Sequence, residues 1–262
     1  MINTKDVCYL FFDYDGTVFL NGEIPKENSQ AIAAAQRLGH RAILNTGRSG
    51  GGLDFSMARH QVISWDGKIF GACDMTYNGR RDHEFGLSRE TAIAWVRYAV
   101  AHRYWIALEG EQENLRLWLD REDNELVRHG EAYVMEMTEA YLKRTDVTKL
   151  SVQKVDGDAP VTDESMIDHG YAVEVLPKGR DKGAAFLDFC RIHKIDPQQC
   201  VCFGDSPNDL AIFQVCPTSV CMVNGTEELK AAATYCAKTE FGVAEGLKWL
   251  FGKDLDLTNG EK

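Results

Sequence analysis

The segment Val7-Cys8-Tyr9-Leu10-Phe11-Phe12-Asp13-Tyr14-Asp15-Gly16-Thr17 places two carboxylates directly after a short apolar run. The run is continuously apolar, as is typical of a strand that is buried on both faces of a parallel sheet. In open α/β sheets, ligands bind at the carboxyl ends of the strands. We therefore expect Asp13 and Asp15 to point into a ligand-binding crevice.

Two other interpretations of this segment are an Asx turn that closes the strand and a calcium-binding loop that opens with D-x-D. An EF-hand loop requires glycine at its sixth position and glutamate at its twelfth. Counted from Asp13, those positions hold Val18 and Ile24, and the glycine comes two residues too early. The calcium loop is therefore excluded, and the Asx turn remains as the structural alternative.

The regions on either side of the middle of the chain alternate short apolar runs with helical patterns. This alternation predicts an α/β fold with a Rossmann-like parallel sheet and helices on both faces. Further strands are expected at 41–45, 62–64, 200–203, 219–223 and 235–237, and helices at 29–38, 183–193, 208–215 and 226–233.

The middle of the chain has a different pattern, with one clear helix at 88–101 among grouped strand-like pieces. Such grouping indicates an α+β insertion rather than a continuation of the same sheet. We therefore predict a core made of 1–77 and 177–262, with an inserted domain at 78–176. The strand-like pieces of the insertion are 104–108, 115–119, 150–152 and 171–176.

Composition and charge argue against nucleic acid and membrane partners. The chain has 262 residues and a formal net charge of −11, which argues against nucleic acid as a partner. No apolar stretch reaches the ~18 residues of a membrane span, and the N-terminal residues do not resemble a secretory signal. The eight cysteines form no C-x-x-C pair, so we expect reduced thiols in a cytoplasmic protein.

A second polar segment, Thr46-Gly47-Arg48, also follows a predicted strand and opens a glycine-rich stretch. A hydroxyl group followed by glycine N–H groups is suited to holding phosphate oxygens. The structural alternative is a plain glycine-rich loop.

A third segment places Lys182 at the start of a predicted helix, where a cation opposes the helix dipole. An anion near Lys182 would explain its position. Lys178 is the rival candidate, and a solvated surface lysine is the structural alternative for both.

The fourth segment, Gly204-Asp205-Ser206-Pro207-Asn208-Asp209, follows another predicted strand. Ser206, Pro207 and Asp209 fit a capping box at a helix start. That pattern leaves Asp205 without a structural explanation.

The carboxyl ends of parallel strands meet at one edge of the sheet, so the polar residues of these segments should converge. Several acids at one place repel each other unless a cation joins them. Oxygen ligands together with a substrate phosphate favour Mg²⁺. Acids, a lysine and a Thr-Gly loop around Mg²⁺ indicate phosphoryl transfer.

These four segments, in this order, resemble the haloacid dehalogenase-like (HAD) superfamily, and the chain is similar to its Cof-type, class IIB phosphatases. The resemblance implies that residues 78–176 form a cap domain. It also implies that Asp13 is the nucleophile and Asp15 the general acid and base, with Asp13, Asp15 and Asp205 as metal ligands. The other implied roles are phosphate binding by Thr46, Gly47, Arg48, Lys182 and Asn208, catalytic assistance by Thr46 and Lys182, and support of metal-bound water by Asp209.

The expected function is an Mg²⁺-dependent phosphatase that hydrolyses a small phosphorylated metabolite, such as a sugar phosphate, through an aspartyl-phosphate. The alternatives are a phosphosugar mutase of the phosphomannomutase type or a dedicated sugar-phosphate phosphatase of the sucrose-phosphate or mannosyl-3-phosphoglycerate type. A phospho-ligand binding protein without turnover is the remote alternative, because a binder needs no acid–base group beside its nucleophile. We expect a monomer or homodimer with no nucleic acid or membrane partner.

Overall fold

The computed structural model describes residues 2–50, 62–83, 85–110, 113–122, 124–160 and 163–255. The chain forms two compact units. The core unit comprises Met1–Gly47, Met57–Asp82 and Asp181–Lys262, and the inserted unit comprises Arg48–Ser56 and His83–Arg180. The predicted boundaries, 77/78 and 176/177, lie a few residues before these divisions.

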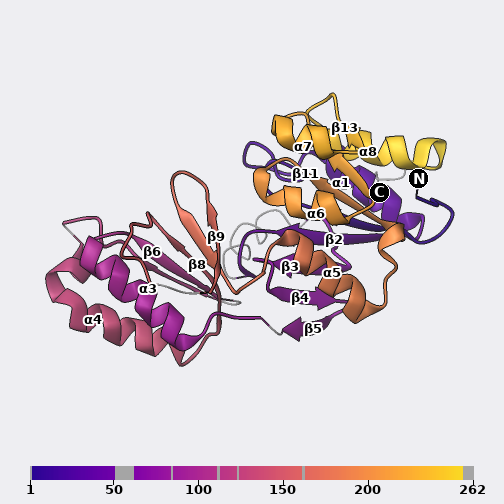
Figure 1. Ribbon diagram of the computed structural model, residues 1–262. Coiled ribbons are helices and arrows are strands. Elements are labelled where there is room, and N and C mark those ends of the chain that lie inside the picture. Colours follow the sequence, from indigo (N-terminus) through magenta and orange to yellow (C-terminus); the bar gives the residue numbers. More distant parts are fainter. Residues whose placement is uncertain are drawn as a thin grey trace. The chain divides into compact units, whose positions relative to one another are not determined.

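The core unit is built on one sheet of eight strands, in the order β13-β12-β11-β1-β2-β3-β4-β5 (Figure 1). The pairs from β13 through β3 are parallel, and β4 pairs with β3 in the antiparallel sense. The strands are β1 Tyr9–Phe12, β2 Arg41–Thr46, β3 Gly67–Phe70, β4 Asp74–Tyr77, β5 Arg80–His83, β11 Cys200–Gly204, β12 Thr218–Cys221 and β13 Tyr235–Cys236.

The first strand lies at the centre of this sheet. Phe12 is in register with Leu44 of β2 on one side and with Phe203 of β11 on the other. The chain adds strands on the β2 side first and on the β11 side later, so the strand order reverses at β1. This reversal is where α/β sheets open a ligand-binding crevice, and Asp13 is the next residue after β1.

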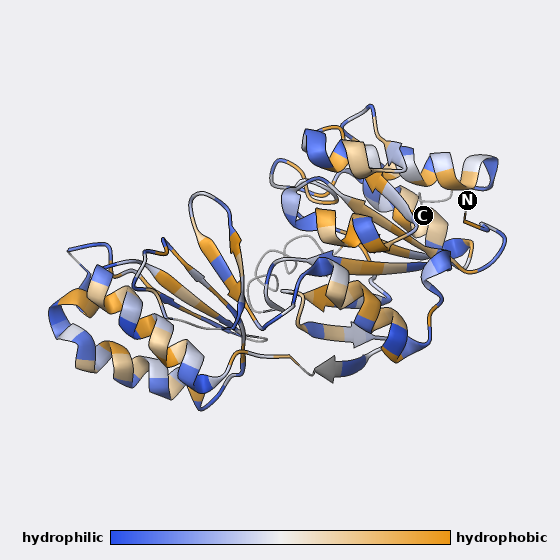
Figure 2. Ribbon diagram, in the orientation of Figure 1, coloured by the Kyte–Doolittle hydropathy of each residue, from blue (hydrophilic) through white to orange (hydrophobic). Residues whose placement is uncertain are grey.

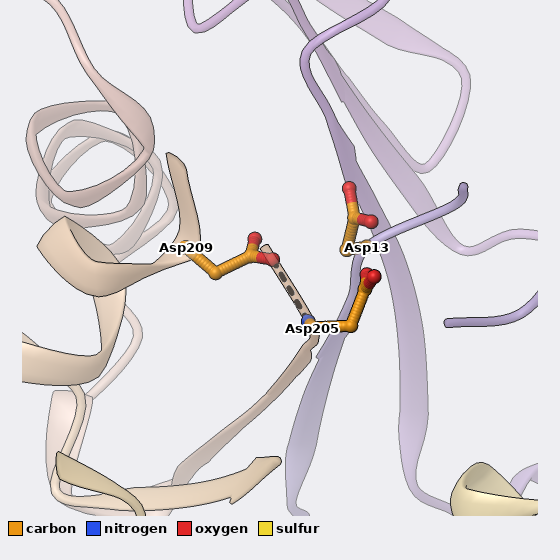
Figure 3. A group of neighbouring side chains, drawn as sticks. All are labelled: Asp13, Asp205 and Asp209. Atoms are coloured by element: carbon orange, nitrogen blue, oxygen red, sulfur yellow. Dashed lines mark hydrogen bonds between the residues drawn. The ribbon is translucent and has the colours of Figure 1, made fainter. Parts of the chain in front are cut away.

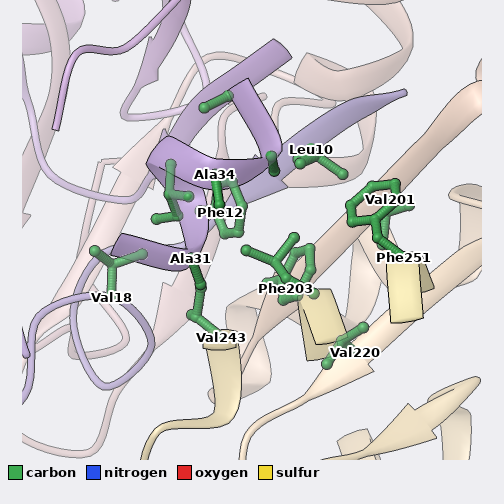
Figure 4. Close-up of a cluster of buried hydrophobic side chains, with 14 of the residues drawn as sticks. Leu10, Phe12, Val18, Ala31, Ala34, Val201, Phe203, Val220, Val243 and Phe251 are labelled. Atoms are coloured by element: carbon green, nitrogen blue, oxygen red, sulfur yellow. The ribbon is translucent and has the colours of Figure 1, made fainter. Parts of the chain in front are cut away.

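Helices cover both faces of the parallel strands. On one face, α1 (Lys26–Arg37) and α8 (Gly242–Phe251) pack on an apolar cluster (Figure 4). On the other face lies α5 (Lys182–His193), whose Phe186 and Phe189 rings meet Phe11 edge-on at 5.0 and 5.5 Å. The remaining helical segments of the core unit are η1 Pro197–Gln199, η2 Pro207–Asp209, α6 Leu210–Val215, α7 Glu227–Ala232 and η3 Gly252–Asp254.

The inserted unit has its own antiparallel sheet, in the order β7-β6-β8-β10-β9. Helices α3 (Arg89–His102) and α4 (Glu125–Leu142) share one apolar cluster with it, centred on residues such as Trp95 and Leu150. Figure 2 shows hydrophobic and hydrophilic residues alternating along both helices, as expected when one stripe is buried. The strands are β6 Ile106–Gly110, β7 Asn114–Leu117, β8 Val147–Val152, β9 Ser165–Asp168 and β10 Val173–Leu176.

This architecture confirms the predicted fold class, an α/β parallel-sheet core with an α+β insertion. The strand expected at 62–64 is wrong, because Val62 is 60% exposed and the third strand is β3 at Gly67–Phe70. The prediction of one helix in the insertion is also wrong, since α4 is a second one. Its pattern is interrupted by Gly130, whose φ of 76° is not helical.

None of the helices in the described residues is long and apolar enough to cross a membrane.

Candidate active site

Three acidic side chains and one lysine form a buried cluster at the carboxyl ends of β1 and β11. Lys182, the first residue of α5, donates hydrogen bonds from Nζ to Asp13 Oδ1 and Asp209 Oδ1, both at 2.6 Å. All three residues are at most 6% exposed. Figure 3 shows the carboxyl groups of Asp13, Asp205 and Asp209 close together, the first two from the ends of β1 and β11 and the third from the helical segment Pro207–Asp209. The predicted convergence of the first, third and fourth segments is therefore present, and Asp13 and Asp209 explain the lysine at a helix start.

The carboxylate of Asp205 is anchored on both oxygens. Thr17 donates from Oγ1 to Asp205 Oδ1 at 3.0 Å, and Asn224 donates from Nδ2 to Oδ2, also at 3.0 Å. Gly16 permits this arrangement, because it has a φ of +78° and a Cβ there would lie 2.2 Å from Asp205 Oδ2. Each carboxylate oxygen keeps a further lone pair, so Asp205 can still bind a cation.

Asp209 uses its carboxylate differently. Oδ1 accepts from Lys182, while Oδ2 accepts from the backbone N–H groups of Asp205 and Ser206 at 3.0 and 3.1 Å. The predicted capping box of Ser206 and Asp209 is present at the start of η2. Asp209 thus fixes the loop that carries Asp205 and orients Lys182 at the same time.

Burial raises the pKa values of two acids of this cluster, Asp13 and Asp205. Burial raises the pKa of Asp13 to about 8; the Lys182 ammonium opposes this, and the Asp209 and Asp205 carboxylates reinforce it. Burial also raises the pKa of Asp205 to about 6, against the hydrogen bond from Thr17. Burial alone would lower the pKa of Lys182, but Asp13 and Asp209 keep it above its usual range, so the side chain stays charged.

The phosphate-loop candidates lie partly with this cluster. Thr46 is buried at the end of β2, and a Cβ at Gly47 would lie 3.4 Å from Asn208 Nδ2, which brings the second and fourth segments together. Arg48, the next residue, is half-buried and is grouped with the inserted unit, and its role in phosphate binding stays a prediction.

Asp15 is exposed beyond the end of β1, and its charge contributes to raising the pKa of Asp205. Lys178, the rival of Lys182, belongs to the inserted unit and pairs with Asp163 at 3.0 Å, with both side chains largely exposed. Lys182 is therefore the lysine that the fold brings to the acids.

Two residues that donate hydrogen bonds to Asp205, Thr17 and Asn224, were not predicted as site residues. Thr17 stands in the quoted D-x-D-G-T segment, which could have indicated it, whereas Asn224 meets Asp205 only through tertiary packing. Their contacts with Asp205 span 188 and 19 positions of sequence.

The acids fit a divalent cation. One carboxylate oxygen of each of Asp13, Asp205 and Asp209 lies within 4.8 Å of the others. Hard oxygen donors of this kind suit Mg²⁺, Ca²⁺ or Mn²⁺. Asp209 Oδ2 accepts two backbone N–H groups, whereas each oxygen of Asp205 accepts one hydrogen bond and Asp13 accepts one from Lys182 on Oδ1. Asp13 and Asp205 are therefore the carboxylates with more capacity for a metal.

An α/β core whose strand ends gather carboxylates and a lysine is suited to binding a cation together with an anionic ligand. Residues 10–247 match the family model of haloacid dehalogenase-like hydrolases. The chain therefore belongs to this family and is a hydrolase of the phosphatase type. This match confirms the predicted resemblance.

Curated relatives include a phosphoglycolate phosphatase of Nitrosopumilus maritimus. It is 26% identical over 236 residues, which cover 88% of this chain and 89% of that protein. A 5-amino-6-(5-phospho-D-ribitylamino)uracil phosphatase of Bacillus subtilis is 38% identical over 76 residues, covering 28% of this chain and 27% of that protein. The matched segment spans only about a quarter of the length of this Bacillus subtilis protein.

Solved structures share the fold. A protein from Geobacillus kaustophilus superposes with a TM-score of 0.76 at 19% identity, covering 94% of this chain and 99% of the other. A HAD subclass IIB sugar phosphatase gives 0.73 at 20% identity, covering 93% and 99%. A HAD/Cof-like hydrolase of Plasmodium vivax gives 0.72 at 19% identity, covering 94% and 96%.

Proposed function

We propose that the protein is an Mg²⁺-dependent phosphatase that hydrolyses a phosphate monoester of a small metabolite through an aspartyl-phosphate on Asp13. The observation that carries this proposal is the buried meeting of Asp13, Lys182, Asp205 and Asp209 at the central strand ends. In this proposal the core unit is the catalytic domain and the inserted unit is its cap.

Charge neutralisation is the first task of these residues. An ionised carboxylate is repelled by a phosphate dianion, so positive charge must be placed next to both. Lys182 lies 2.6 Å from Asp13 Oδ1 and supplies one positive charge at that position. Thr46, Gly47 and Asn208 are the candidates to hold the remaining phosphate oxygens by hydrogen bonds.

Mg²⁺ is the proposed cofactor. Asp13 and Asp205 would hold it by carboxylate oxygens and Asp15 by its backbone carbonyl, with Asp209 supporting a bound water. When bound, the ion supplies Lewis-acid withdrawal of charge from the phosphoryl oxygens.

Asp13 and Asp15 divide the chemistry. A carboxylate oxygen of Asp13 attacks phosphorus, the bond from phosphorus to the ester oxygen breaks, and Asp15 gives its proton to the leaving alcohol. Asp15 then takes a proton from a water molecule, which attacks phosphorus and breaks the bond to Asp13, releasing phosphate. A positioned proton donor contributes typically ~10²–10⁴-fold.

The substrate class is also a proposal. Sugar phosphates come first, supported by the fold shared with a subclass IIB sugar phosphatase. Phosphoglycolate and a phosphoribitylaminouracil are further candidates, from the names of the relatives. We also propose a cytoplasmic monomer or homodimer without nucleic acid or membrane partners. The acidic net charge of −11 supports the absence of a nucleic acid partner, and the eight free cysteines support a reducing compartment.

The test is phosphate release from p-nitrophenyl phosphate and from a panel of these phosphate esters, with Mg²⁺ and with EDTA. We expect turnover that requires Mg²⁺ and that falls by ~10³-fold or more in Asp13→Asn, because removal of a nucleophile costs several orders of magnitude. Turnover in EDTA, or a fully active Asp13→Asn protein, would contradict the proposal.

Product analysis separates this function from the phosphosugar mutase. With a sugar phosphate as substrate, ³¹P NMR distinguishes inorganic phosphate from an isomeric sugar phosphate. We expect inorganic phosphate, and accumulation of the isomer would assign the protein to the mutase instead.

A further inference from the structure

Asn45 is a buried amide that makes no hydrogen bond within the described part of the chain. It is 2% exposed, and neither its Oδ1 nor its Nδ2 has a partner there. A buried polar group gives up its hydrogen bonds to water, so native proteins rarely leave one unpaired without a reason. Both the oxygen and the nitrogen of the Asn45 amide lack a hydrogen-bond partner in the described residues. A ligand that forms hydrogen bonds with this amide would explain why a polar side chain is buried here.

The register of the sheet places Asn45 on the face that α5 covers. Side chains alternate between faces along a strand, so Asn45 shares a face with Ile43, whose register partner is Phe11. Phe11 packs against the Phe186 and Phe189 rings of α5. Asn45 therefore lies on the face of the sheet from which Lys182 reaches Asp13.

The same register places Asn45 beside Asp13. Leu44 pairs with Phe12 at the end of the β1–β2 register, and Asn45 and Asp13 are the residues that follow them. Neighbouring strands lie about 4.8 Å apart, which brings these two residues near each other. Asp13 directs Oδ1 to Lys182. The unpaired amide of Asn45 therefore lies at the same level of the sheet as Asp13, the proposed nucleophile, and one residue before Thr46.

We propose that Asn45 is an additional ligand of the phosphoryl group, with its Nδ2 donating a hydrogen bond to a phosphate oxygen held next to Asp13. This inference rests on the proposed function. A neutral carboxamide suits the position, because it stabilises a phosphate dianion without offering Asp13 a second cation to pair with. Hydrogen bonds to charged groups are stronger than those between neutral groups.

The test uses calorimetric titration of inorganic phosphate into the 262-residue chain in saturating Mg²⁺. We expect Asn45→Ala to weaken phosphate binding about 10-fold or more, and to leave Mg²⁺ binding in the absence of phosphate within about twofold. The matched control is Asn28→Ala. Asn28 is fully buried, and its Nδ2 also lacks a partner in the described residues, but it lies on α1, on the opposite face of the sheet.

Asn45→Leu separates a binding role from a structural one, because leucine has a similar shape and no polar atoms. We expect its phosphate-free melting temperature to equal or exceed that of the native protein, while added phosphate raises it less. Phosphate affinity within about twofold of native in both Asn45 variants would overturn the inference, as would a phosphate-free loss of stability with unchanged affinity. A native protein with no Mg²⁺-dependent hydrolysis of any ester would instead refute the proposed function.

Discussion

At the scale of single residues, the position of Asp205 depends on a glycine on another strand end. Gly16 has a φ of +78°, and any Cβ there would overlap Asp205 Oδ2. Two features therefore require glycine at position 16: the left-handed backbone conformation and the close approach of the Asp205 carboxylate. Thr17 and Asn224 then fix the orientation of that carboxylate.

We expect Gly16→Ala to weaken Mg²⁺ binding by ~10-fold or more, because Asp205 must move away from its partners. Left-handed backbone costs a non-glycine residue roughly 1–2 kcal/mol in any case. Gly22→Ala is the matched control, since Gly22 has a φ of +92° and nothing within 4 Å of its Cβ position. Titration calorimetry on both variants checks this, and equal Mg²⁺ affinities in the two would contradict the role of the close contact.

The raised pKa values of Asp13 and Asp205 predict a pH dependence of metal binding. Mg²⁺ needs ionised carboxylates, so it must displace the proton of Asp13 below about pH 8 and also that of Asp205 below about pH 6. Apparent affinity should therefore rise with pH, by up to about tenfold per unit between those values and more steeply below them. Mg²⁺ titrations across this range measure it.

In the Asp13→Asn variant, the apparent Mg²⁺ affinity should no longer change between about pH 6 and pH 8, and it should still fall with decreasing pH below about pH 6. A native affinity that is flat from pH 6 to 8 would contradict the assignment of the higher pKa to Asp13.

The central acids could be predicted from the sequence, because each directly follows an apolar run or starts a helix. Asp13 and Asp205 end strands, and the cation at Lys182 stands where the helix dipole disfavours it. Asn45 ends the strand expected at 41–45 and was given no role, since its importance depends on an unpaired amide that only packing reveals.

At the scale of elements, α5 begins with a cap and a catalytic candidate in consecutive residues. Asp181 accepts a hydrogen bond from the Ala184 N–H at 2.7 Å, and Lys182 follows as the first helical residue. The cap therefore fixes the first turn that directs Lys182 to Asp13 and Asp209.

We expect Asp181→Ala to lower the free energy of unfolding by about 0.5–2 kcal/mol and to reduce turnover as well, because the first turn of α5 loosens. Ser88→Ala removes the corresponding cap of α3 in the inserted unit, where Ser88 Oγ accepts from the Thr91 N–H at 3.0 Å. It should cost similar stability and leave turnover of p-nitrophenyl phosphate unchanged. Denaturant unfolding and steady-state kinetics test the pair, and unchanged turnover in Asp181→Ala would count against this role of the cap.

Elements with uniform apolar runs were predictable, and those with mixed patterns were not. The strands β1, β2 and β11 lie in the middle of a parallel sheet, and each contains an uninterrupted apolar run, which in β2 is Ala42-Ile43-Leu44. By contrast, α4 carries many polar residues and a non-helical Gly130, and α8 includes Gly246, which packs closely on Val220. Their apolar faces become evident only against the sheets that they cover.

At the scale of the whole molecule, the two units have separate apolar cores and are expected to unfold in separate steps. The core cluster includes Ile32 of α1, and the cluster of the inserted unit includes Ile106 of β6. Since the acids that would bind Mg²⁺ all belong to the core unit, the ion should stabilise that unit alone.

We expect two calorimetric transitions, of which only one rises in temperature with added Mg²⁺. Ile32→Val should lower that same transition, and Ile106→Val should lower the other, each by ~0.5–1.5 kcal/mol of unfolding free energy. Differential scanning calorimetry resolves them. A single transition that moves as a whole in both variants would show that the units unfold together.

The chain returns from the inserted unit between Arg180 and Asp181, one residue before Lys182 begins α5. This end of the His83–Arg180 segment thus directly adjoins an active-site position, whereas its other end, at 82/83, falls within the edge strand β5, far along the sheet from β1. In the evolution of the family, exchange of the insertion is therefore expected to tolerate changes of length at the first junction and to keep strict length at the second. Chimaeras that swap this domain between relatives should be joined accordingly.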